Sequence, residues 1–129
     1  MAGNAARDGD VAGMNAPGAA AGHVVYAGSG LAITRTDAPA GLILAGQVDE
    51  DSQPALETEL ARLPPAAELH FDLAGLQYCE LAALRAIIAL TGTGAAGRRV
   101  VLHKVPRQLL TVLAVLGWDA TSGLIIVTG

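Results

Sequence analysis

The sequence has little of several features that define large classes of protein. It contains one cysteine in 129 residues, which excludes an internal disulfide framework and favours a reducing compartment. No apolar run approaches the roughly 20 residues of a membrane-spanning helix, and the N-terminus lacks the basic and apolar regions of a signal peptide. These absences predict a soluble, cytoplasmic protein with one domain and no direct membrane insertion.

Basic and aromatic residues are also scarce. The net charge is −4, so the chain lacks the basic excess that nucleic-acid binding requires. Aromatic residues make up 3% of the chain, whereas hydrophobic residues make up 52%. The core must therefore be built mainly from aliphatic side chains.

The first part of the chain differs from the rest. Residues 1–22 are rich in alanine, glycine and asparagine and show no hydrophobic periodicity. Such a segment cannot bury enough surface to offset the entropy lost on ordering, so we expect a disordered tail. The remaining residues, 23–129, are expected to form the domain.

Strand and helix patterns alternate along this domain. Two short strands flank Gly28-Ser29-Gly30, which is typical of a β-hairpin. The expected strands lie at residues 23–27, 31–36, 41–45, 69–73, 98–105 and 124–127, and the expected helices begin near residues 52, 80 and 106. This order predicts an α/β fold: a mostly parallel sheet of about five to six strands, with an N-terminal hairpin and three helices packed on it.

The alternation also predicts which residues form the core. Residues 41–45 are continuously apolar, which indicates burial on both faces of a central strand. One sheet core is expected to contain these side chains: Leu44, Phe71, Leu73, Val101 and Ile125.

The stretch at residues 68–90 organises the functional question. Its strand is expected to end at Ala74-Gly75, and an amphipathic helix is expected to begin at Glu80. A helix N-terminus presents free backbone N–H groups, which suit an anion or an acidic group of a partner. The residues placed there are Cys79, Glu80, Leu81, Ala82 and Ala83.

The familiar catalytic and ligand-binding motifs are absent or misplaced. The G-x-G-x-x-G at residues 92–97 follows a helix and precedes a strand, which is the reverse of a dinucleotide site. The three histidines do not have metal-ligand spacing, and Cys79 has no second cysteine. No G-x-S-x-G is present. We therefore expect no enzyme activity, no cofactor and no metal.

Several short segments together resemble a STAS domain, the fold of bacterial anti-sigma-factor antagonists. The resemblance spans about residues 24–127 and rests on order and spacing. It is carried by GQVD at residues 46–49, FDLAGLQY at 71–78, GRRVVLH at 97–103, Pro106 and LAVLGW at 113–118.

The resemblance implies a phosphorylation switch that this chain has lost. In that family the strand–helix turn typically has the sequence Asp-Ser-Ser-Gly-Leu, and an anti-sigma kinase phosphorylates the second serine. By position, the acidic residue matches Glu80, the first serine Leu81, and the phosphorylated serine Ala82. The glycine and the leucine match Ala83 and Leu84. Alanine has no hydroxyl, so no phosphoacceptor is expected at this site.

Two classes of function follow from the resemblance. The first is a protein-interaction module that binds an anti-sigma factor or kinase, or a related signalling partner. The second is an adaptor or structural subunit of a lipid-transport or multi-domain sensor complex. The expected partner-binding residues are those of the turn, residues 79–83, together with Asp49. Two alternatives stay open for Leu81: an exposed apolar contact or a residue packed inward. The oligomeric state stays open as well.

Overall fold

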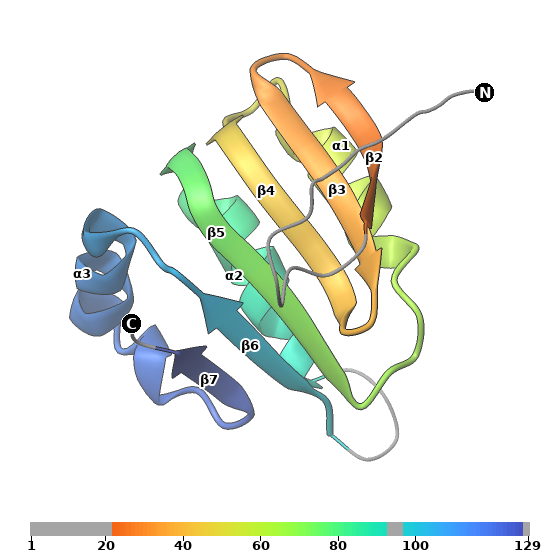
Figure 1. Cartoon of the computed structure of the whole chain (residues 1–129). Coiled ribbons are helices and arrows are strands. Elements are labelled where there is room, and N and C mark those ends of the chain that lie inside the picture. Colours follow the sequence, from red (N-terminus) through yellow and green to blue (C-terminus); the bar gives the residue numbers. More distant parts are fainter. Residues whose placement is uncertain (1–21, 93–96, 128–129) are drawn as a thin grey trace.

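The computed structural model describes residues 22–92 and 97–127 (Figure 1). Its strands are β2 (Gly22–Gly28), β3 (Leu31–Asp37), β4 (Ala40–Val48), β5 (Glu68–Cys79), β6 (Arg99–His103) and β7 (Leu124–Val127). Its α-helices are α1 (Gln53–Ala61), α2 (Leu81–Ile88) and α3 (Arg107–Leu116), and its 3₁₀ turns are η1 (Ala89–Gly92) and η2 (Trp118–Ala120). The tail expected at residues 1–22 lies outside the described residues except for Gly22, which begins β2, and most of the loop at residues 92–97 also lies outside them.

The strands form one six-stranded sheet in the order β2-β3-β4-β5-β6-β7. The pairs β2–β3 and β3–β4 are antiparallel, whereas β4–β5, β5–β6 and β6–β7 are parallel. The prediction of a mostly parallel sheet was therefore inexact, although the α/β class is confirmed. Short turns join β2, β3 and β4, and such turns permit only antiparallel pairing, because a parallel pair needs a long crossover.

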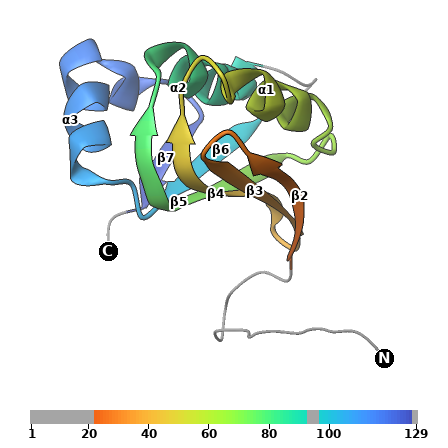
Figure 2. The same ribbon diagram turned by 90° about the horizontal axis from the view of Figure 1, so that it is seen from above.

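The helices lie on one side of the sheet. Figure 2 shows α1 and α2 over the sheet and α3 further along the same side. No element in the described part of the chain covers the opposite face, which we call the open face. Each strand therefore presents alternate side chains to the helices and to the open face.

Leucine dominates the core between sheet and helices. Leu44, Phe71 and Leu73 are fully buried there, as predicted. Val101 and Ile125 were predicted in the same core, and this was wrong, because neither belongs to it. Val101 pairs with His70 on one side and with Ile125 on the other, on the open face, where Val101 is 5% exposed and Ile125 is 39% exposed. A continuous apolar run such as residues 100–102 does not reveal which residues point inward, and a shift of one residue exchanges the two faces.

Two further strand predictions require correction. β4 is not buried on both faces, because Ala45 is exposed and Ile43 is only partly buried. β5 does not end at Ala74 but continues to Cys79, so that the whole strand has twelve residues. Gly75 serves a different purpose there: a Cβ at this position would lie 3.0 Å from the Cβ of Ala45, so glycine permits the close approach of β4 and β5.

The helix ends follow the expected chemistry. α1 begins after Ser52 with Pro54 in its first turn, and α2 begins after Glu80. α3 follows Pro106 and ends at Gly117, whose φ of 72° lies in the left-handed region that glycine adopts most readily. As a result, the N-termini of α1 and α2 lie next to the carboxyl ends of β4 and β5.

Candidate functional site

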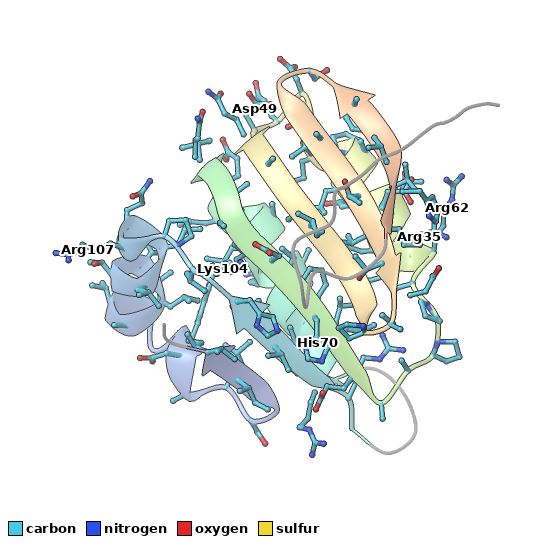
Figure 3. All side chains as sticks on the ribbon, in the orientation of Figure 1. Arg35, Asp49, Arg62, His70, Lys104 and Arg107 are labelled. Atoms are coloured by element: carbon cyan, nitrogen blue, oxygen red, sulfur yellow. The ribbon has the colours of Figure 1, made fainter. Side chains whose placement is uncertain are left out.

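The carboxyl ends of β4 and β5 lie side by side. Val48 pairs with Cys79, and the backbone N–H of Glu80 donates a hydrogen bond of 2.8 Å to the carbonyl of Val48. The loop that starts at Asp49 and the turn at the start of α2 therefore meet at one edge of the sheet (Figure 3). We call the group Asp49, Tyr78, Glu80, Leu81 and Ala82 the rim.

The start of α2 rests on the backbone of Glu80. The carbonyl of Glu80 accepts from the N–H groups of Ala83 at 3.1 Å and Leu84 at 3.0 Å, which forms the first turn of the helix. Its carboxylate does not cap the helix and instead accepts from the hydroxyl of Tyr78 at 3.1 Å. This hydrogen bond raises the pKa of Tyr78, and the charges of Glu80 and, more weakly, Asp49 add to the effect. The two acidic residues of the rim, Asp49 and Glu80, thus both act on the phenol of Tyr78.

The other side of the rim is apolar and exposed. The side chains of Leu81 and Tyr78 are each 50% exposed, and Ala82 is exposed beside them. The inward face of α2 is formed by Ala83, Leu84, Ile87 and Ile88. Of the two alternatives for Leu81, the structure favours the exposed one.

Two of the residues expected to bind a partner are buried. Cys79 is 8% exposed and Ala83 is completely buried, so both support the rim from beneath. Burial raises the pKa of the Cys79 thiol to about 11, and the neighbouring Glu80 charge adds to this. The thiol is therefore protonated and poorly nucleophilic at neutral pH.

Asp49 organises its own loop. Its Oδ1 accepts from the backbone N–H of Asp51 at 3.0 Å and of Ser52 at 3.1 Å. The buried hydroxyl of Ser52 lies 2.9 Å from the carbonyl of Gln47, to which it donates, and 3.2 Å from Asp49 Oδ1. Asp49 is therefore held on the rim by contacts that also prepare the start of α1.

Sequence reasoning missed Tyr78 as a member of the rim. Part of the signal was present: Tyr78 is a large amphipathic side chain two residues before the acidic Glu80. It was overlooked because the strand was expected to end at Ala74. α3 also reaches this edge, where Gln108 Nε2 donates to the carbonyl of Gln77 at 3.2 Å.

Metal-binding clusters and membrane-spanning helices are not found in the described residues. Within residues 22–92 and 97–127, no group of three or more histidine, cysteine or acidic side chains is arranged to hold a metal ion. In the same ranges, no helix is long and apolar enough to cross a membrane.

Comparisons with known proteins agree with this architecture. The family model described as "Mlab, STAS domain" matches residues 31–128. Among solved structures, the crystal structure of an anti-sigma factor antagonist from Mycobacterium paratuberculosis is similar, with a TM-score of 0.55 and 19% sequence identity. The match covers 87% of this chain and 90% of that one. At this identity the likeness concerns the fold. No curated protein matches the sequence.

The family match starts at the first residue of β3 and includes the whole of the rim. It agrees with the resemblance seen in the sequence alone and with the order of the elements in the sheet. This chain belongs to the STAS domain family.

Proposed function

We propose that this chain is a non-catalytic, cytoplasmic interaction module that binds an anti-sigma factor or a related signalling protein through the rim. It does so without a serine phosphorylation switch. The observation that carries the proposal is the half-exposed Leu81 beside the exposed Ala82, at the first turn of α2.

The composition of the rim supports this function. An apolar centre with a polar edge is the usual arrangement of a protein interface. The apolar centre here is Leu81 with the ring of Tyr78, and the edge consists of Asp49 and Glu80. A complementary partner surface would present an apolar side chain flanked by lysine or arginine.

The absence of a hydroxyl at Ala82 supports binding that is not switched. A phosphoserine at this place would add about −1.5 to −2 charges beside Glu80, and such a charge would oppose a partner's apolar contact. Alanine cannot carry it. The interaction is therefore constitutive with respect to this position.

The same observation favours a second candidate, an adaptor subunit of a lipid-transport or multi-domain sensor complex. A permanent subunit needs a binding surface that phosphorylation does not block. The rim is such a surface at Ala82, because alanine has no hydroxyl to accept a phosphate. Both candidates use the rim and differ in the partner.

The experiment begins with capture of the partner by the full chain from the native cell, followed by identification and calorimetric titration. Leu81→Ala is expected to weaken binding by about 1 kcal/mol or more, the scale of an interface hot spot, because it removes the apolar centre. Val115→Ala is the matched control, since Val115 is 78% exposed in the last turn of α3, at the opposite end of that helix from Gln108, which contacts β5. If the two variants bind equally well, Leu81 is not part of the interface. An anti-sigma factor among the captured proteins supports the first candidate, and a transport or sensor subunit supports the second.

A further inference from the structure

The open face carries a row of polar side chains across β5 and β6. Glu68 and His70 lie on β5, and Arg99 and His103 lie on β6. Figure 3 shows His70 on the sheet, far from Asp49 and the rim. This row therefore has no part in the rim.

The two imidazoles are in direct contact. His70 Nδ1 lies 2.7 Å from His103 Nε2, and the rings are stacked with centroids 5.0 Å apart. On its other side, His70 Nε2 lies 2.9 Å from Glu68 Oε1. The second oxygen of Glu68 accepts from Arg99 Nε at 3.1 Å. Four side chains thus form one continuous chain of hydrogen bonds between the two strands.

The geometry limits the number of protons that the two imidazoles in this hydrogen-bond network can hold. An ionised carboxylate only accepts, so His70 Nε2 must carry the proton of the bond to Glu68. His70 Nδ1 then either accepts from a neutral His103 or, if His70 is a cation, donates to it. In both states one proton lies between the rings. If both imidazoles were cations, two N–H groups would face each other across 2.7 Å.

We propose that Glu68, His70 and His103 form a proton-sensitive clamp between β5 and β6. The clamp holds while the two imidazoles together carry at most one positive charge, and it opens when both become protonated. Opening removes a side-chain connection between β5 and β6 and leaves their backbone pairing in place, and β6 in turn pairs with β7 and leads into α3.

The surroundings are consistent with this assignment. In the part of the chain that the structure describes, the charged groups near the pair are Glu68 and Asp72 on β5 and Arg99 and Lys104 at β6. Lys104 Nζ lies 3.8 Å from Asp72 Oδ2. The flanking strands add no charge at these rows, where β4 presents Gly41 and Ile43 and β7 presents Ile125 and Val127. Burial, followed by the charge of His70, lowers the pKa of His103. The Glu68 carboxyl has a lowered pKa, chiefly through its bond to His70 and next through Arg99.

The sign of the pH effect follows from the lowered pKa of His103. As pH falls below 6.5, the ordinary value, the unfolded chain takes up a proton at this residue before the folded chain does. The contribution of the clamp to stability is therefore complete above that pH. It is lost as pH falls from there toward the lower pKa of the folded state.

The experiment combines an NMR titration of the imidazole resonances with urea unfolding between pH 8 and pH 5, on the full chain. His103 should titrate below 6.5, and its midpoint should rise in His70→Gln, which removes the neighbouring charge. In His103→Gln the loss of stability on acidification should be smaller than in the natural chain. His23→Gln is the control, because His23 is exposed on β2 and its replacement should leave that loss unchanged.

Two results would overturn the clamp. The first is a His103 midpoint that is the same with and without His70. The second is an acid-induced loss of stability that is equal in His103→Gln and the natural chain. Should His103→Gln fail to fold, the titration of His103 in His70→Gln still decides.

Discussion

Leu81, Ala82 and Cys79 are close in sequence but have different surroundings. Leu81 and Ala82 face solvent at the first turn of α2, whereas Cys79 points beneath the turn. The sequence placed all three at a strand–helix junction but could not decide their exposure. Their exposure depends on where β5 ends. The strand ends at Cys79, five residues after Ala74, where the alternation suggested its end. Pairing with β4 continues to Cys79 and produces this extension.

Burial of Cys79 should make its thiol unreactive in the folded protein. Because the pKa is raised to about 11, very little thiolate exists at pH 8, and access is restricted as well. Alkylation with iodoacetamide at pH 8, followed by mass spectrometry, should be slow in the native protein and fast in the urea-unfolded chain. Equal labelling rates in the two states would show that the thiol is open to solvent.

The element that best shows the limits of the sequence is the loop before α1. Acidic residues and Pro54 predicted the helix start correctly. They did not reveal that Asp49 accepts hydrogen bonds from two backbone N–H groups of its own loop, since a turn of this kind depends on backbone angles. A residue expected to contact a partner thus has a structural role as well.

Asp49→Ala should therefore destabilise the fold in the absence of any partner. The expected loss is about 1 kcal/mol, the usual cost of removing a side chain that satisfies N–H groups at a helix start. Glu50→Ala is the control, because Glu50 is the exposed neighbour of Asp49. Chemical denaturation of the three proteins gives the comparison. Equal stability of the two variants would contradict the structural role of Asp49.

At the scale of the whole molecule, composition and alternation sufficed for the class of fold. They predicted about five to six strands, three helices and an aliphatic core that contains Phe71; the described residues form six strands and three α-helices, and Phe71 is fully buried. They misplaced Val101 and Ile125, because a run of apolar residues is compatible with either face of a strand. The open face, and with it the contact of His70 with His103, could not be foreseen without the sheet order and register.

The domain should be independent of the residues that precede it. Among residues 22–92 and 97–127, the buried core cluster extends from Leu31 to Leu113, and the family match begins at residue 31. Removal of residues 1–21 is therefore expected to leave the melting temperature nearly unchanged, as measured by calorimetry. A large fall in that temperature would show that the N-terminal segment contributes to folding.

The measurement that tests the central claim most directly is the partner affinity of Ala82→Asp. The introduced carboxylate would place a negative charge at the position that the family resemblance matches to a phosphorylated serine, and we expect binding to weaken by about 1 kcal/mol or more. Folding should be little affected, since an acidic residue suits the start of a helix. Ala67→Asp is the matched control: it adds the same charge at an exposed alanine just before the opposite end of β5. Weaker binding of Ala82→Asp alone, with both variants folded in thermal melts, is the result that we predict. Unchanged affinity of a well-folded Ala82→Asp would place the interaction surface elsewhere.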